Sequence, residues 1–321
     1  MKITSQQTIL VTGGAGFIGS HLIEQLIDRY LVVCVDDFND YYNPIWKQGN
    51  IKSFEDHSNF TLYKTDIRDL VGLKTIFENH GFSKIVHLAA RAGVRPSIAN
   101  PLLYEDVNVK GTLNLLKMAK QFRIPHFIFA SSSSVYGNQK KMPFSETDPV
   151  NQPISPYAAS KKSAEMFCYT YAYLYRVKMT CLRFFTVYGE RGRPDMAPYL
   201  FTEALFKGKP ISKFGTGKSE RDYTYIGDIV NGIVKTLSHP FNFEIINLGN
   251  NKPVALTDFI NTLEMATGRR ANLINMPAQP GDVDFTYADT QKAKRLLKWQ
   301  PKTTLKQGIA KFVKWYQHNR L

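Results

Sequence analysis

The sequence predicts a doubly wound α/β fold, in which helices cover both faces of a parallel sheet, with a smaller α/β C-terminal lobe. Short apolar runs alternate with helical patterns along the first half of the chain, which is typical of consecutive β-α-β units. A glycine-rich turn follows the first apolar run, and later runs end in small or acidic residues. Because the carboxyl ends of parallel strands meet at one edge of a sheet, we expect these residues to gather where such folds bind ligands.

The elements of the first half follow from this alternation and from local start signals. Ser155 is a candidate helix N-cap and Pro156 suits the first helical position, so a helix is expected to begin there. The run SSSSVYG, from Ser131 to Gly137, has the composition of a flexible linker, but its place after an apolar strand favours a strand end that lines a site. The predicted strands are 8–11, 31–35, 60–63, 84–88 and 127–130, and the predicted helices are 20–30, about 102–122 and 156–175.

Beyond Arg183 the alternation weakens, and loops rich in glycine, proline and charge separate the elements. We therefore predict one domain over residues 1–180 and a second lobe over residues 181–321, with the segment at about 222–240 packing back on the first domain. The helices expected in the second half lie near 198–207, 227–237, 256–267 and 305–315.

Composition narrows the class of protein. The chain has 321 residues, 43% of them hydrophobic, which is enough for a large core. Its net charge of +14 suggests nucleic acid as a ligand, but lysine and arginine are spread along the chain, so we favour a solvated basic surface and expect no nucleic-acid partner. No apolar run is long enough for a membrane span, and a cytoplasmic protein is expected. Cys34, Cys168 and Cys181 lack metal-ligand or paired spacing, so we expect buried thiols and no metal site.

The segment GGAGFIG predicts a dinucleotide site. Gly13 allows the tight turn, Gly16 lets the backbone approach a pyrophosphate, and Gly19 lets helix and strand pack closely. A strand before, a helix after and an acid at the end of the next strand provide the context that this Rossmann motif requires. That acid, Asp36, can accept hydrogen bonds from a ribose 2′-hydroxyl and would repel a 2′-phosphate, so NAD is favoured over NADP.

The end of the third predicted strand carries a second candidate for the cofactor site. Asp66 and Ile67 are placed there to flank the adenine. A helix N-cap is an equally good interpretation of Asp66, and the two roles are compatible.

A tyrosine and a lysine four residues apart, in Tyr157-Ala-Ala-Ser-Lys161, predict a catalytic pair on one helix face. A nearby ammonium favours the phenolate, and so would the positive charge of a nicotinamide. Lowering a phenol pKa from about 10 to about 7 requires roughly 4 kcal/mol of preferential stabilisation of the anion. By itself this spacing usually marks only a helix face; here it follows a serine-lined strand end and a dinucleotide motif.

Together these motifs resemble the extended short-chain dehydrogenase/reductase family over essentially the whole chain. Within that family the chain is most similar to nucleotide-sugar 4-epimerases, and among them to UDP-glucuronate 4-epimerases. The resemblance implies an isomerase that oxidises sugar C4 with tightly bound NAD, lets the keto sugar rotate and returns the hydride to its other face. The segments that carry the resemblance are TGGAGFIGSHL, HLAARAGVRPS, FASSSSVYG, YAASK and LRFFTVYGERGRPDMA.

The resemblance also implies the roles of individual residues. Tyr157 is expected to take the proton of the sugar 4-hydroxyl, Lys161 to hold the nicotinamide ribose and lower the tyrosine pKa, and Ser132 to hydrogen-bond the reacting oxygen. The residues expected to bind the cofactor are Gly13, Gly16, Phe17, Ile18, Gly19, Asp36, Asp37, Asn39, Asp66, Ile67, Leu88, Ala89, Ala90, Asn108, Tyr157 and Lys161.

The residues around the serine run suggest the substrate. Relatives that dehydrate or decarboxylate the keto sugar carry an acid just before VYG, where this chain has Ser133 and Ser134, so the reaction is expected to end with the returned hydride. By resemblance, Thr186 and Arg193 would hold the sugar carboxylate together with one of these serines. Fixing the carboxylate opposes the alignment through which a β-keto acid loses CO2, and arginine suits that task. Arg191 is the alternate arginine.

The nucleotide end of the substrate site is assigned by resemblance alone. Arg221 would contact the diphosphate, or else form a surface salt bridge with Glu220 or Asp222. Asp282 would hold the uridine ribose. Arg95 could face the sugar or only brace its loop.

The leading interpretation is the interconversion of UDP-glucuronate and UDP-galacturonate. A 4-epimerase of neutral or N-acetylated UDP-hexoses is one alternative, although it would have little use for Arg193. A UDP-glucuronate decarboxylase or nucleotide-sugar dehydratase is another, which Ser134 disfavours. The resemblance also implies a homodimer paired through the helices at about 102–122 and 156–175, and polysaccharide biosynthesis as the usual destination of such sugars.

Overall fold

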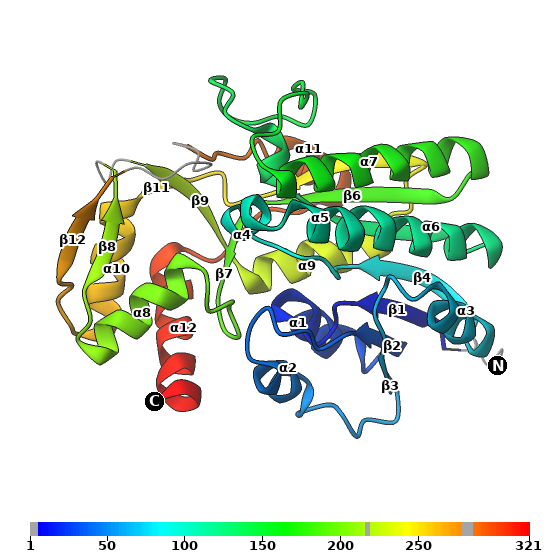
Figure 1. Cartoon of the computed structure of the whole chain (residues 1–321), viewed down its shortest axis with the longest axis horizontal. Helices are drawn as coiled ribbons and strands as arrows, with labels where there is room; N and C mark the ends of the chain where they lie inside the picture. Colours follow the sequence, from blue (N-terminus) through cyan, green and yellow to red (C-terminus); the bar gives the residue numbers. More distant parts are fainter. Residues whose placement is uncertain (1–5, 216–218, 278–284) are drawn as a thin grey trace.

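A seven-stranded, wholly parallel sheet forms the centre of the larger part of the molecule (Figure 1). The computed structural model describes residues 6–215, 219–277 and 285–321. The chain passes from β1 outward through β2 and β3, then returns to the other side of β1 with β4, so the direction of winding reverses between β1 and β4. In sheet order the strands are β10 (Phe243–Leu248), β6 (Lys178–Phe184), β5 (His126–Ser132), β4 (Phe82–His87), β1 (Thr8–Thr12), β2 (Leu31–Asp36) and β3 (Phe60–Lys64).

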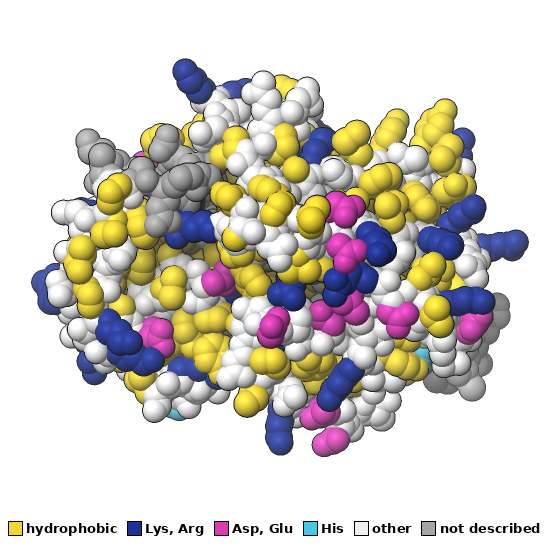
Figure 2. Space-filling model, in the orientation of Figure 1, with side chains coloured by type: hydrophobic (Ala, Val, Ile, Leu, Met, Phe, Trp, Pro, Cys, Tyr) yellow, Lys and Arg dark blue, Asp and Glu magenta, His cyan; other side chains and the backbone are white. Residues whose placement is uncertain are grey.

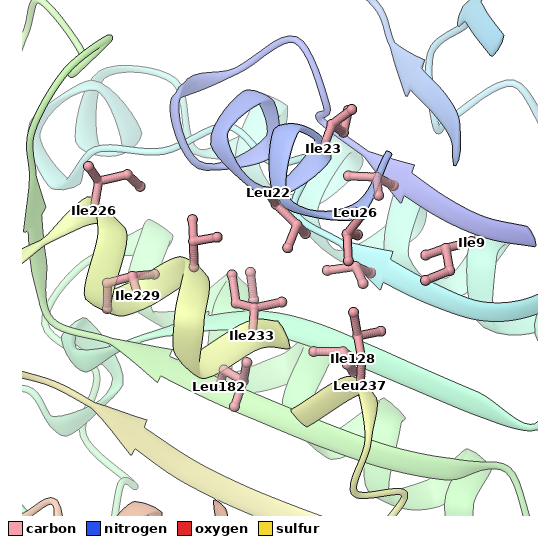
Figure 3. Packing of buried hydrophobic residues seen from close by; sticks show 14 of the residues in the cluster. Ile9, Leu22, Ile23, Leu26, Ile128, Leu182, Ile226, Ile229, Ile233 and Leu237 are labelled. Carbon is pink, nitrogen blue, oxygen red and sulfur yellow. The ribbon is translucent and has the colours of Figure 1, made fainter. Parts of the chain in front are cut away.

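Helices cover both faces of this sheet, because alternate strand residues point to opposite sides. Ile9 of β1 faces the layer formed by α1 (Phe17–Leu26) and α9 (Ile226–Leu237), whose leucines and isoleucines interdigitate (Figure 3). Leu10, the next residue, faces the opposite layer. That layer contains α3 (Leu70–Asn79), α6 (Gly111–Gln121) and α7 (Pro156–Tyr175). The predicted doubly wound fold is confirmed.

The sheet draws on the chain beyond residue 180. Strand β6 spans that position, and β10 adds an edge strand from the second half of the chain. Helix α9, within the segment at 222–240, packs on α1. The larger part of the molecule therefore includes segments on both sides of the predicted boundary, and the division into two domains stays a prediction.

The helix predicted at about 102–122 is interrupted. Its first turn is α5 (Pro101–Tyr104), and a π-helical turn, Glu105–Lys110, separates that turn from α6. A π-helical turn inserts an extra residue into a helix and is often found at functional sites. It lies beside α7, which also contacts α4 (Val94–Ala99).

The smaller part has its own core. In it Tyr223 stacks on Phe259 with ring centres 4.3 Å apart. Two small sheets form it, one of β11 (Pro253–Ala255), β9 (Glu220–Tyr225) and β7 (Thr186–Tyr188), the other of β12 (Leu273–Met276) and β8 (Ile211–Phe214). The helices that pack with these sheets are α8 (Ala197–Lys207), α10 (Leu256–Thr267) and α12 (Leu305–Arg320). The described residues also form α2 (Pro44–Ile51), a 3-10 turn over Ser133–Tyr136 and α11 (Gln291–Leu297).

The charged side chains on the surface and the buried cysteines both bear on the sequence predictions. Lys and Arg side chains are scattered over the face seen in Figure 2, where several lie beside acidic ones. Within the described ranges, no helix is long and apolar enough to cross a membrane. The three cysteines are buried and unpaired, as predicted. The described part of the chain holds no group of three or more His, Cys, Asp or Glu side chains that could bind a metal ion.

Candidate active site

A cavity of about 360 Å³ opens at the carboxyl edge of the sheet, where the winding reverses between β1 and β4. Its wall combines the β1–α1 turn, the ends of β2, β4 and β5, the start of α7 and the segment after β6. This is the position at which doubly wound sheets bind ligands. The catalytic and cofactor motifs of the sequence therefore meet in one cavity.

The glycine turn brings backbone close to this cavity. Gly13 has a φ of +69°, and a Cβ there would lie 2.7 Å from the Ala89 nitrogen. A Cβ at Gly19 would lie 2.2 Å from the Gly13 oxygen, so both positions exclude other residues. No side chain caps the start of α1, and Phe17 and Ile18 line the cavity with Gly16. The first N–H groups of α1 are thus available to an anionic ligand.

Asp36 lies buried at the end of β2, with both oxygens engaged. Its Oδ2 accepts from the Ala15 N–H at 3.1 Å and its Oδ1 from the Phe38 N–H at 2.9 Å. Burial raises the pKa of this carboxyl, against the charge of Lys47, whose Nζ lies 3.9 Å away. The sequence reasoning missed Lys47, which is buried on α2 and lines the cavity; its only signal was its place in the helix after the acidic strand end.

The other predicted cofactor residues at the strand ends also line the cavity: Asp37, Asn39, Asp66, Ile67, Leu88, Ala89 and Ala90. Asp66 does not cap the following helix, because the Asp69 side chain accepts the N–H groups at the start of α3. Instead Asp66 pairs with Arg68, whose Nη2 lies 2.6 Å from Oδ2. That pairing lowers the Asp66 pKa, although burial acts in the opposite direction. The cap interpretation of Asp66 is therefore wrong.

Asn108 was predicted to bind the cofactor but is not among the residues that line the cavity. It lies buried in the π-helical turn, where its Oδ1 accepts from the Arg91 N–H at 2.8 Å. Its Nδ2 donates to the Arg91 oxygen at 2.9 Å and to Ser160 Oγ at 3.0 Å. All of its polar atoms are used in fastening the loop after β4 to α7, so its role here is to shape the wall of the cavity.

Ser132, Tyr157 and Lys161 come together as predicted. Helix α7 begins at Pro156 because the Ser155 side chain caps it, accepting from the Ala158 N–H. The helix presents Tyr157 to Ser132 at the end of β5, close enough for the serine hydroxyl to lower the pKa of the phenol. The Ser132 hydroxyl itself donates to Ser134 Oγ at 3.1 Å. One turn later, Lys161 donates to the Ala130 oxygen at 2.8 Å.

The source of the pKa shift on Tyr157 differs from the prediction. Burial raises the Tyr157 pKa, and the effects that lower it come from the Ser132 hydrogen bond and the charge of Arg193. Lys161 was expected to lower it, but its ammonium is directed to the Ala130 carbonyl, and burial lowers its own pKa to about 8. The unassisted pocket therefore keeps Tyr157 protonated at neutral pH.

A buried ion pair that the sequence did not predict stabilises this arrangement. Glu165, one turn after Lys161 on α7, accepts from Arg183 Nε and Nη2 at 2.8 and 2.9 Å. Ser131, the residue before Ser132, donates to the same carboxylate at 2.6 Å. Strand β6, helix α7 and the serine run are thus fixed to one another next to the candidate catalytic residues.

The candidate substrate residues separate into two groups. Ser133, Ser134, Thr186 and Arg193 line the cavity beside Tyr157. Arg191 does not line it; this side chain pairs with Glu24 of α1 at 2.5 Å. The geometry therefore favours Arg193 over its alternate.

Two further predicted substrate residues, Arg95 and Arg221, are not among the described residues that line the cavity. Arg95 of α4 lies over the Phe214 ring of β8 at 5.2 Å, which bridges the two parts of the molecule. Arg221 lies on β9 and donates to the Glu220 oxygen at 3.0 Å. Asp222 is a buried acceptor of backbone N–H groups and no surface ion-pair partner. Asp282 falls outside the described residues.

The sequence pattern of the GDP-mannose 4,6-dehydratase family matches residues 10–312. The chain belongs to this family. The match confirms the resemblance to extended short-chain dehydrogenases/reductases and covers both parts of the molecule, from β1 to α12.

Characterised members of the family and solved structures share this architecture. The UDP-glucuronate 4-epimerase of Thermodesulfobacterium geofontis is 43% identical over 312 residues, covering 97% of this chain and 96% of that protein. The structure of UDP-glucuronic acid 4-epimerase from Bacillus cereus, in complex with UDP-glucuronic acid and NAD, matches with a TM-score of 0.91 and 35% identity, covering 97% and 99% of the two chains. UDP-glucose 4-epimerase from Thermotoga maritima, with UDP-glucose, matches with a TM-score of 0.90 and 33% identity over the same shares.

Proposed function

We propose that this family member is an isomerase, an NAD-dependent UDP-glucuronate 4-epimerase that forms UDP-galacturonate through a transient 4-keto sugar. The observation that carries the proposal is a single cavity with Asp36 at one end and with Tyr157, the serine run and Arg193 at the other. The names of the Thermodesulfobacterium and Bacillus relatives support the same substrate.

The residues at the glycine turn fit NAD. The uncapped N–H groups at the start of α1 suit a pyrophosphate, and Gly13 leaves room for its close approach. Each Asp36 oxygen accepts one backbone N–H and keeps a lone pair for a ribose hydroxyl. When bound, NAD supplies the hydride acceptor and donor for sugar C4.

Tyr157 and Ser132 act on the oxygen at C4. Tyr157 takes the proton of the 4-hydroxyl and later returns it, while Ser132 donates a hydrogen bond to that oxygen and stabilises its negative charge. Lys161 has a pKa of about 8 and donates to the Ala130 carbonyl. It contributes positive charge on the side of Tyr157 where the nicotinamide ribose would bind. The roles of these three residues are part of the proposal.

Arg193 distinguishes a uronate from a neutral sugar. It is the arginine that lines the cavity beside Tyr157, with Thr186 and the serine hydroxyls nearby. The acids among the described lining residues, Asp36, Asp37 and Asp66, lie at or just after the ends of β2 and β3, on the other side of β1 and β4 from the serine run. No carboxylate of the described lining lies next to the serine run, so dehydration lacks its general acid or base.

Purified protein incubated with UDP-glucuronate and no added cofactor tests the proposal. NMR should detect UDP-galacturonate without a pentose product, because the cofactor is regenerated in each cycle. Turnover of UDP-glucose or UDP-N-acetylglucosamine with none of UDP-glucuronate would refute it.

We also retain the homodimer, the cytoplasmic location, the two-domain division and the role in polysaccharide biosynthesis as predictions. Helix α7 carries the exposed side chains Met166, Tyr169, Tyr173 and Leu174, and apolar side chains gather over this helix in Figure 2. Such a face supports pairing through the helices around α6 and α7. Light scattering, which measures the molar mass of the protein in solution, tests the predicted homodimer.

A further inference from the structure

Two residues outside the proposed catalytic steps hold Arg193. Its Nε and Nη2 donate to Asp195 Oδ1 and Oδ2 at 2.9 and 2.5 Å, the paired geometry that suits a guanidinium and a carboxylate. Tyr41 donates its hydroxyl to Asp195 Oδ2 at 3.1 Å. The Arg193 guanidinium carbon lies 5.5 Å from the centre of the Tyr41 ring. Each member of this triad therefore contacts the other two.

The triad joins two separate segments of the chain. Arg193 and Asp195 follow β7, whereas Tyr41 lies in the loop between β2 and α2, just after Asp36. Asn39 shapes this loop by accepting the Tyr41 N–H at 3.1 Å. On the other side, a Cβ at Gly93 would lie 2.6 Å from the Tyr41 hydroxyl oxygen, so only glycine leaves that hydroxyl in place.

The pairing leaves one part of the guanidinium for a second partner. Asp195 occupies the edge formed by Nε and Nη2, while Nη1 makes no hydrogen bond to any residue that the structure describes. Arg193 and Tyr41 both line the cavity beside Tyr157, but Asp195 is not part of the lining. A long, flexible side chain is thus held from outside the cavity while its remaining N–H groups can meet a substrate group.

We propose that Asp195 and Tyr41 are positioning residues that suppress loss of CO2 from the 4-keto uronate by fixing the direction from which Arg193 holds the sugar carboxylate. The inference rests on the proposed function and deepens it. Asp195 and Tyr41 then determine whether the keto sugar is epimerised or loses CO2, whereas Arg193 alone recognises the charge of the sugar carboxylate.

The side reaction that they suppress is a β-keto acid decarboxylation. Once C4 is oxidised to a ketone and the cofactor is reduced, the C5–C6 bond breaks and its electron pair enters the C4 carbonyl as an enolate. CO2 leaves, and C5 takes a proton from water to give a 4-keto pentose. The bond must align with the carbonyl π system to break, so an arginine with a fixed direction opposes the step and an arginine that is free to turn permits it.

Single-turnover product analysis tests the inference. Enzyme with its bound cofactor is held in excess over UDP-glucuronate radiolabelled at C6, and released CO2 is compared with UDP-galacturonate. Asp195→Asn removes the charge that fixes Arg193 and should raise the ratio of CO2 to UDP-galacturonate by roughly tenfold. Tyr41→Phe, which removes one hydrogen bond to Asp195, should raise it by about threefold. If Asp195→Asn fails to fold, Tyr41→Phe decides by the same ratio.

Glu24→Gln is the matched control. It breaks the ion pair of Arg191, in the same loop but outside the cavity lining, and should leave the ratio unchanged. Wild-type ratios in both Asp195→Asn and Tyr41→Phe would overturn the inference, as would an equal rise in Glu24→Gln. If the wild-type enzyme makes no UDP-galacturonate at all, the proposed function itself is overturned before any variant is compared.

Binding gives a readout that needs no turnover. In a Tyr157→Phe background, calorimetry compares UDP-glucuronate with UDP-glucose. Asp195→Asn should keep the preference for the uronate to within about threefold, because Arg193 retains its charge. Loss of that preference would contradict a positioning role, since Asp195 would then be required for binding itself.

Discussion

At the scale of single residues, Tyr157 depends on its immediate neighbours for its reactivity. Burial raises its pKa, while the Ser132 hydrogen bond and the Arg193 charge lower it. Tyr157 is protonated at neutral pH, and in the proposed mechanism it would become a base only when further positive charge, such as that of an oxidised nicotinamide, enters the cavity. The proposed proton transfer would thereby be linked to the oxidised state of the cofactor.

Replacement of Tyr157 by Phe should lower epimerase turnover by roughly 10²- to 10⁴-fold, the usual contribution of a positioned acid or base. Bound NAD, measured after denaturation, should remain. Tyr175→Phe, an exposed position on the same helix outside the side chains named for pairing, is the control and should behave as the wild type. Full activity of Tyr157→Phe would remove this residue from the mechanism.

Arg193→Ala should reduce turnover of UDP-glucuronate much more than turnover of a neutral UDP-hexose, by about tenfold or more, because a charge-assisted contact to the carboxylate is lost. Steady-state kinetics with both sugars measures the difference. Arg191→Ala, which breaks the contact with Glu24, should affect both sugars alike. Equal losses in Arg193→Ala would contradict its carboxylate role.

Sequence reasoning identified residues with a recognisable motif and missed those that act through the fold. The glycine turn, Asp36 and the pair Tyr157 and Lys161 are set by spacing within one segment, so they could be predicted. Lys47 and Tyr41 enter the cavity from the loop and helix after β2, where no motif marks them. Their contacts with Asp36 and Asp195 depend on tertiary structure, which spacing does not encode.

At the scale of elements, the π-helical turn is the part of the wall that departs most from the expected pattern. An apolar period of 3.6 predicts a helix but not the place where an extra residue is inserted. Here Asn108 turns inward and fastens the loop after β4. Likewise, β6 and β10 were hard to assign to the first sheet, because their partners lie far away in sequence.

Asn108→Ala should destabilise the protein by about 1–3 kcal/mol, since it leaves the Arg91 backbone groups without their partner. It should also weaken NAD retention indirectly, through a looser loop at Ala89 and Ala90. Thermal unfolding and bound-cofactor content measure the two effects. Asn108→Asp keeps the acceptor for the Arg91 N–H but places a carboxylate oxygen against the Arg91 carbonyl, so it should destabilise the protein at least as much as Ala. Loss of NAD with unchanged stability would point to a direct cofactor contact and refute the wall-shaping role.

At the scale of the whole molecule, the buried histidines make stability depend on pH. His126, in the interior strand β5, is buried, and neither ring nitrogen has a hydrogen-bond partner among the described residues. Burial, with the charges of Lys84 and Lys178, lowers its pKa to about 4. Between about pH 6.5 and about pH 4 the unfolded chain binds a proton that the folded protein excludes.

The stabilising contribution of neutral His126 should therefore be complete above about pH 6.5 and be lost as the pH falls toward 4, by about 3 kcal/mol in total. Urea denaturation at several pH values measures it. His126→Gln cannot titrate, so the stability difference between wild type and variant should change across this range. A difference that stays constant with pH would contradict the lowered pKa, because it would show that His126 binds its proton equally well in the folded and unfolded states.

In the proposed mechanism a hydride leaves C4 and the same hydride returns on the other face, which requires the cavity, the cofactor site and the serine run to act together. UDP-glucuronate deuterated at C4 tests it most directly, with enzyme carrying only its own cofactor. We expect UDP-galacturonate in which the deuterium is fully retained at C4, with none found in water. Deuterium lost to solvent, or product formed without deuterium at C4, would contradict it.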